Sequence, residues 1–217
     1  MATKPYIGMG MEGSIARWYE KNTAKDMQAF RCLADRIADL VAAGSAILEV
    51  APGPGFLAVE LAKRGFAVAG LDISKTFVDL ANKNAEKSGA RVRFEQGNAS
   101  QMPFADRSFD FLVCRAAFKN FADPVGALRE MHRVLKPSGR GLIIDLRRDA
   151  SMADVARYVD GLDLSLFNRL FMKFTFRAML LPRAWRVDAF AKILDQIPFR
   201  HTEIVPNAIG MEIWLDV

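Results

Sequence analysis

Cysteine is scarce in this chain, and long apolar runs are missing. The only cysteines, Cys32 and Cys114, stand far apart, so they form neither a metal-spaced cluster nor a disulfide framework. No uncharged run approaches the roughly 20 residues that a membrane-spanning helix needs. Residues 1–5 lead into no uninterrupted apolar segment of the kind found in signal peptides. We therefore expect a cytoplasmic protein.

A strong excess of one charge is also missing. The 30 Lys and Arg residues stand against 25 Asp and Glu residues, which gives a net charge of +5. Acids and bases are mixed along most of the sequence, which argues against a dedicated nucleic-acid binder. The sequence has neither internal repeats nor low-complexity segments. With 217 residues, 51% of them apolar, it predicts one globular domain with a full core.

Strand-like and helix-like patterns alternate through residues 44–150, which predicts βαβ units and a mostly parallel sheet with helices on both faces. Helices are expected at about 56–64, from Ser74 to about Lys87, and at 124–135, with a turn at 136–139. Apolar or alternating runs predict seven strands, at 46–50, 67–71, 91–94, 109–114, 141–144, 199–205 and 211–216.

Two segments frame this core. Residues 1–43 predict a helical cap of two helices broken near Asn22 and Thr23, with Gly44 ending the second one. Residues 151–186 interleave Phe, Leu and Met with basic side chains such as Arg169, Lys173 and Arg177. Because this insertion follows the fifth strand, we expect a helical lid over the carboxyl edge of the sheet, where ligands bind. Residues 187–217 then supply a last helix and two strands.

The most specific local signal is the Gly/Pro turn after the first strand. Such a turn lets backbone approach a ligand closely and points N–H groups outward from a helix N-terminus. Gly53-x-Gly55-x-x-Ala58, followed by Asp72 near the spacing of a ribose-binding acid, fits a nucleotide-type cofactor.

Three features argue against a nicotinamide cofactor. Glu49, within the first strand, would repel a pyrophosphate and suits an ammonium or sulfonium cation. Pro52 and Pro54 remove two backbone N–H donors. Helices precede the first strand, whereas nicotinamide-binding domains more often begin with that strand.

Over about residues 45–146 the chain resembles the class I S-adenosylmethionine (AdoMet)-dependent methyltransferases. Glu49-x-Ala51-x-Gly53-x-Gly55 resembles the acidic, glycine-rich loop of that family, with Ala51 at the first glycine. Residues 70–74 (Gly-Leu-Asp-Ile-Ser) and 97–104 (Gly-Asn-Ala-Ser-Gln-Met-Pro-Phe) resemble its second-strand and adenine-flanking motifs, with Asn98 at the common acid. Residues 108–110 and 133–140 resemble the signatures around the fourth and fifth strands.

The resemblance implies a Rossmann-like α/β fold whose seven-stranded sheet is mostly parallel, with an antiparallel last strand and a helical lid. It implies AdoMet as the methyl donor and no metal. Glu49 would help to hold the methionine ammonium, with an ordered water between them, and Asp72 would accept hydrogen bonds from both ribose hydroxyls. The resemblance assigns further donor contacts to Tyr19, Ala51, Pro52, Gly53, Gly55, Phe56, Ile73, Asn98, Ala99, Arg115 and Ala116.

Among these, Ile73, Asn98 and Ala99 would meet the adenine. Arg115 and Ala116 would lie near the methionyl arm, and Tyr19 would close the pocket from the N-terminal helices.

The acceptor is less well defined. Residues 118–121 (Phe-Lys-Asn-Phe) resemble a segment of ubiquinone/menaquinone C-methyltransferases, which suggests a small apolar or aromatic acceptor between the N-terminal helices and the lid. Methyl transfer is an in-line displacement that depends mainly on alignment. If a base is needed, His132, His201, Lys119 and Asp145 are candidates by chemistry, and none has a motif behind it.

Several alternatives stay open. The chain could bind AdoMet without turnover, or the lid could be an amphipathic helix that contacts a membrane, with a lipid or isoprenoid acceptor. The simpler alternative is that the basic lid residues only solvate its outer face. A nucleic-acid methyltransferase is disfavoured. DNA amino-methyltransferases carry a base-gripping motif after the fourth strand, and this chain has Cys114-Arg115-Ala116-Ala117 there instead. The sequence leaves the oligomeric state and the methylated atom open.

Overall fold

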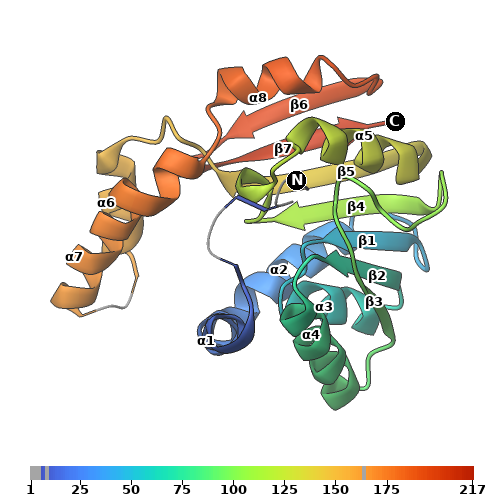
Figure 1. Cartoon of the computed structure of the whole chain (residues 1–217), viewed down its shortest axis with the longest axis horizontal. Helices are drawn as coiled ribbons and strands as arrows, with labels where there is room; N and C mark the ends of the chain where they lie inside the picture. Colours follow the sequence, from blue (N-terminus) through green and yellow to red (C-terminus); the bar gives the residue numbers. More distant parts are fainter. Residues whose placement is uncertain (1–5, 8–9, 163–164) are drawn as a thin grey trace, which may run out of the picture.

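The structure is a computed structural model that describes residues 6–7, 10–162 and 165–217. Leu164, which belongs to the predicted lid, lies outside the described residues. A central sheet is flanked by helices on both faces, and a helical insertion projects from one edge (Figure 1).

The sheet has the predicted seven strands, in the spatial order β3-β2-β1-β4-β5-β7-β6. All neighbouring pairs from β3 to β5 are parallel, whereas β7 is antiparallel to both β5 and β6. This confirms the predicted topology. The strands are β1 (Ala46–Val50), β2 (Ala67–Asp72), β3 (Val92–Gln96), β4 (Phe109–Arg115), β5 (Leu135–Leu146), β6 (His201–Pro206) and β7 (Gly210–Asp216).

Eight α-helices and four shorter helical turns are found within the described residues. None of these helices is long and apolar enough to cross a bilayer. The α-helices are α1 (Gly13–Thr23), α2 (Met27–Ala38), α3 (Phe56–Lys63), α4 (Lys75–Ser88), α5 (Pro124–Val134), α6 (Met152–Asp160), α7 (Leu166–Thr175) and α8 (Val187–Leu194). The turns are η1 (Ala24–Asp26), η2 (Phe118–Asn120), η3 (Phe176–Leu180) and η4 (Leu181–Arg183).

The core consists of two apolar layers, one on each face of the sheet. Successive strand residues point to opposite faces, so Ile47 packs with the helices α2, α3 and α4, while Leu48 packs with α5 and α8. Both side chains are fully buried. Figure 1 shows these two groups of helices on opposite sides of the strands. Because both faces are covered, the central strands are continuously apolar, and only their ends can hold polar groups.

Helix α4 begins as predicted. Ser74 accepts a hydrogen bond from the Phe77 N–H at 3.1 Å and donates its hydroxyl to the Met11 carbonyl at 2.6 Å. Glu12 accepts from the next two N–H groups of the helix, those of Lys75 and Thr76. The N-terminal segment is therefore fastened to the first turn of α4.

Two predicted boundaries are wrong. Residues 136–139 belong to β5 instead of forming a turn, because the pairing with β4 shifts between Phe109 and Phe111 and the extra residues form a bulge. Ser138, at φ +68°, absorbs the distortion and donates its N–H to Val217. Helix α2 ends at Ala38, several residues before Gly44, so Leu40 lies beyond it and is exposed.

The insertion 151–186 forms helices, as predicted, and projects beyond the carboxyl ends of the parallel strands (Figure 1). It has a small apolar core of its own, in which Val155 and Val159 of α6 pack with Phe176 and Leu181. Its two ends meet: Arg147 and Trp185 form a parallel β-bridge, and the Arg148 N–H donates to the Trp185 carbonyl at 2.9 Å.

Candidate functional site

The parallel strands bring most of the predicted site residues to one edge of the sheet. Glu49 lies near the end of β1, Asp72 and Arg115 are the last residues of β2 and β4, and Asn98 follows β3. Since the carboxyl ends of neighbouring parallel strands meet at the same edge, segments that are distant in sequence form one continuous rim.

The loop between β1 and α3 has an unusual backbone. Ala51, Gly53 and Gly55 adopt φ values of +57°, +55° and +76°, a left-handed conformation that glycine adopts most easily. A Cβ at Gly55 would also come within 2.8 Å of the Cβ of Ala81, so the loop lies close against α4. Ala51 takes the left-handed conformation with a side chain present, held by its N–H bond to the Leu71 carbonyl at 2.8 Å.

Asp72 ties this loop to the end of β2. Its carboxylate accepts from the Gly53 N–H at 3.0 Å and from the Ser74 N–H at 2.9 Å. Burial raises the Asp72 pKa to about 6, although these N–H bonds oppose the rise. Each carboxylate oxygen keeps a lone pair, so Asp72 can still accept from two hydroxyl groups.

Glu49 is the least satisfied polar group of the site. The side chain is only 4% exposed, and its Oε2 has no hydrogen-bond partner among the described residues. Burial raises the Glu49 pKa to about 8, and the nearby Ala58 N–H and Arg115 guanidinium offset this only in part. A buried carboxyl with one unpartnered oxygen is suited to a cationic ligand group that restores its charge.

Aromatic rings surround the loop. Tyr19 of α1 packs edge-on against Phe77, with ring centroids 5.7 Å apart, and lies over Gly53, 3.9 Å from where a Cβ would be. The predicted position of Tyr19 beside the loop is therefore found. Pro52 is buried next to it.

Two of the predicted site residues, Arg115 and Phe56, contact the same aromatic ring, that of Phe30. The Arg115 guanidinium lies 4.8 Å from the ring centroid of Phe30 in α2, and Phe56 packs against the same ring at 5.7 Å. The side chain of Phe56 thus contributes to the core that supports the loop. Ala116 is exposed at φ +59° directly beyond β4.

The turn after β3 lies against β2. The Gly97 N–H donates to the Asp72 carbonyl at 2.9 Å, which brings the partly exposed Asn98 and Ala99 close to Ile73. Asn98 Oδ1 accepts from the Ser100 N–H at 3.1 Å, so the Asn98 amide N–H₂ is the group left to face a ligand.

The four candidate bases separate into two pairs. Lys119 and Asp145 form a buried ion pair at the site edge, with Nζ and Oδ1 2.7 Å apart. The second carboxylate oxygen of Asp145 accepts from the Lys119 N–H at 2.9 Å. Because its oxygens are occupied, Asp145 fastens η2 to β5 and is poorly placed to accept a further proton.

The two histidines lie at the opposite edge. His132, near the end of α5, contacts the Pro198 carbonyl through Nε2 at 3.1 Å and packs against Phe199. His201 begins β6, beside Asp216, the last residue of β7. Neither side chain can reach the rim that holds Glu49 and Asp72.

Tyr6 is a site residue that the sequence analysis missed. It forms an antiparallel bridge with Phe121. Burial raises the pKa of its phenol, as do the negative charges of Asp72 and Asp145. No motif surrounds Tyr6, and only the pairing of distant segments brings it over the site.

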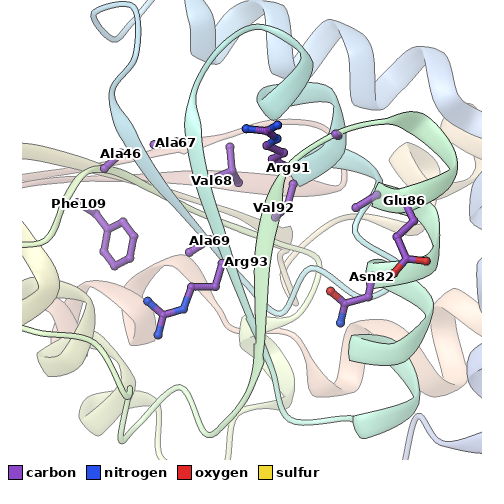
Figure 2. Close-up of a pocket in the computed structure, with 12 residues that line it drawn as sticks. Ala46, Ala67, Val68, Ala69, Asn82, Glu86, Arg91, Val92, Arg93 and Phe109 are labelled. Atoms are coloured by element: carbon purple, nitrogen blue, oxygen red, sulfur yellow. The ribbon is translucent and has the colours of Figure 1, made fainter.

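A wide hollow of about 700 Å³ lies at the other end of the strands, where Ala46, Ala67 and Val92 begin β1, β2 and β3 (Figure 2). It is open to solvent and lies at the end of the strands opposite to Glu49 and Asp72. No group of three or more His, Cys, Asp or Glu side chains that could hold a metal occurs within the described ranges.

Comparisons with known proteins agree with this geometry. A family model described as a methyltransferase domain matches residues 48–143. A demethylmenaquinone methyltransferase from Chlorobaculum parvum is 35% identical over 167 residues, which cover 74% of this chain and 68% of the relative. Another from Deinococcus radiodurans is 39% identical over 107 residues, but this covers only 48% of the chain and 44% of that relative. The chain thus spans less than half of some curated relatives that it matches.

Solved structures share the fold. A protein from Methanococcus maripaludis, provisionally assigned as an AdoMet-dependent methyltransferase, superimposes with a TM-score of 0.75 at 22% identity, covering 99% of this chain and 96% of that one. The [4+2]-cyclase SpnF superimposes with a TM-score of 0.61 at 23% identity, over 82% of this chain and 59% of its own. The fold alone therefore does not define the reaction.

Proposed function

The chain belongs to the class I AdoMet-dependent methyltransferases, and we propose that it transfers the methyl group of AdoMet to a small apolar or aromatic acceptor. The observation that carries the proposal is Glu49, a buried carboxyl whose Oε2 has no partner within the described residues, beside a glycine loop tied to Asp72. These groups match the two polar ends of the donor, an ammonium and a ribose diol.

AdoMet supplies the electrophilic methyl group on a sulfonium. The residues of this chain bind and orient it. Glu49 and Asp72 hold the two polar ends, Gly53 allows backbone to lie against the donor, and Asn98 and Ile73 meet the adenine. Tyr19 and Tyr6 limit access of water from the N-terminal side. Alignment and exclusion of water supply much of the acceleration in such a displacement.

The acceptor site is proposed between α1 and the lid. Relatives named as demethylmenaquinone methyltransferases support an apolar acceptor. Among the four candidate bases, Asp145 is occupied by Lys119 and both histidines lie at the other end of the strands, which favours an acceptor that is already nucleophilic. Both cysteines are unpaired, which supports a reducing compartment and our expectation of a cytoplasmic protein.

Donor binding is tested by calorimetric titration of AdoMet and its demethylated product. We expect Asp72→Asn to weaken AdoMet binding at least tenfold, because a neutral amide is a poorer acceptor for two hydroxyl groups than a carboxylate. Asp35→Asn is the matched control, since Asp35 is exposed and pairs with Arg64, which follows the end of α3 that lies away from the site. Equal affinities of the two variants would refute the assignment of Asp72.

Methyl transfer is then tested with isotopically labelled AdoMet against a panel of aromatic, quinol, thiol and lipid-like acceptors. Transfer to an apolar acceptor supports the proposal. Tight donor binding without transfer to any member of the panel would favour a non-catalytic AdoMet-binding protein.

A further inference from the structure

Helix α7 exposes an unusual amount of apolar surface. Leu166, Phe167, Leu170, Phe171 and Phe174 are each 60–77% exposed. On a helix these positions lie on one side, within an arc of about 140° at 100° per residue. Met172, on the opposite side of α7, joins the core of the lid, and Lys173, at the margin of the arc, pairs with Asp160 at 2.8 Å.

The same segment is basic. From Leu164 to Arg186 the sequence holds five Arg or Lys residues and no Asp or Glu. Arg177 stands two residues after α7 and, with Arg148, lines a hollow of about 240 Å³ whose other walls include Met152 and Leu181. Both arginines are exposed. Guanidinium groups over an apolar hollow fit a phosphate that is attached to an acyl chain.

We infer that α7 docks on an anionic phospholipid surface, with its apolar arc inserted among the acyl chains and Arg148 and Arg177 on the headgroup phosphates. An apolar helix face flanked by basic side chains is the pattern of an interfacial helix. The position of α7 at the outermost part of the lid (Figure 1) leaves this face free to meet a flat surface.

A second copy of the chain is the competing occupant, and two features disfavour it. The exposed arc amounts to on the order of 500 Å², below the roughly 800 Å² per partner of a standard protein interface. Two lids facing each other would also bring basic side chains together, since the sequence from Leu164 to Arg186 has five basic and no acidic residues.

The test is flotation of the purified chain with vesicles of phosphatidylcholine alone or mixed with phosphatidylglycerol. We expect binding to the anionic vesicles, weakened by salt, and at least fivefold less binding to the neutral ones. Leu170→Glu should lower the bound fraction at least fivefold, whereas Leu40→Glu, the same change at an exposed leucine after α2, should leave it unchanged. Arg148→Gln and Arg177→Gln should weaken binding to the anionic vesicles only.

The AdoMet affinity is measured by calorimetry, separately from vesicle binding, so failure of the proposed function and failure of this inference can be told apart. A variant that keeps the AdoMet affinity of the wild type is also shown to be folded. If Leu170→Glu loses the AdoMet affinity, the milder variant Phe167→Ser is used in its place. The inference is wrong if the chain floats with neither kind of vesicle, or if Leu170→Glu and Leu40→Glu reduce binding equally. It is also wrong if sedimentation shows a dimer that Leu170→Glu dissociates while vesicles are not bound.

Discussion

Glu49 illustrates how folding and ligand binding can make opposite demands on one side chain. Its pKa is raised from 4.5 to about 8 by burial, so between these pH values the folded chain holds a proton that the unfolded chain has released. Stability therefore falls as the pH rises through this window. The ammonium group of a ligand would favour the charged form of Glu49 and so offset this loss of stability.

We predict that Glu49→Gln raises the melting temperature of the unliganded protein at pH 8 by about 3 °C or more, and by less at pH 5, where Glu49 is already protonated. The same variant should bind AdoMet at least tenfold more weakly. Donor binding by the wild type at pH 7 should release a proton, measured by calorimetry in buffers of different ionisation enthalpy, and the variant should not.

Glu60→Gln is the matched control at another buried glutamate. Burial opposes ionisation of Glu60, but its bonds to Arg64 and Lys63 outweigh this and lower its pKa. Glu60→Gln should therefore lower the melting temperature. If both variants shift it in the same direction, the account of Glu49 is incorrect.

Ala51 gives a second prediction at this scale. Its φ of +57° costs a residue with a Cβ about 1–2 kcal/mol, whereas glycine adds about 0.5–1 kcal/mol of unfolded-state entropy. Ala51→Gly should then leave the free energy of unfolding unchanged or raise it by up to about 1.5 kcal/mol, measured by urea denaturation. Ala85→Gly, inside α4, should lower it by about 1 kcal/mol or more, and an equal loss in both variants would contradict the strain at Ala51.

The first turn of helix α4 is stabilised by residues that are distant in the sequence, Met11 and Glu12. Ser74 satisfies one N–H of the helix and also holds Met11. We predict that Ser74→Ala lowers stability by about 1 kcal/mol and makes the N-terminal segment more accessible to protease. Ser165→Ala removes the cap of α7, whose bond to the Asn168 N–H is longer at 3.4 Å, and should have a smaller effect in thermal denaturation. Equal effects would mean that the contact with Met11 adds nothing.

The sequence predicts elements where local pattern determines them. Continuous apolar runs, the Ser74 cap and Pro124 at the start of α5 placed most strands and helices within a few residues. The bulge at Ser138 was missed because it depends on pairing with Phe109 and Val217, not on local turn residues.

The site shows the same limit. The motifs placed Glu49, Asp72 and Arg115 on one rim because strand order follows from topology. They could not show that Asp145 is held by Lys119, or that Tyr6 lies over the rim, since both depend on three-dimensional packing.

At the scale of the whole molecule, the two ends of the parallel strands differ in the side chains that they carry. The carboxyl ends of the parallel strands hold the proposed donor-binding groups, and both histidines lie at the other end. We predict that the double variant His132→Gln/His201→Gln keeps the AdoMet affinity and the methyl-transfer rate within twofold, while losing a little thermal stability through the lost His132 contacts. Calorimetry and the labelled-donor assay measure these quantities. A large loss of rate with donor affinity intact would show that a histidine takes part in the reaction.

The joined ends of the lid have an evolutionary consequence. Because Arg147 and Trp185 are paired, the insertion begins and ends at one point beside β5, and the buried part of its apolar cluster comes from residues 150–181. Insertions, deletions or wholesale replacement between these residues would leave the donor loop and the strand order untouched. We therefore expect that replacing this one segment would change the acceptor that is methylated while the proposed binding of the donor is kept.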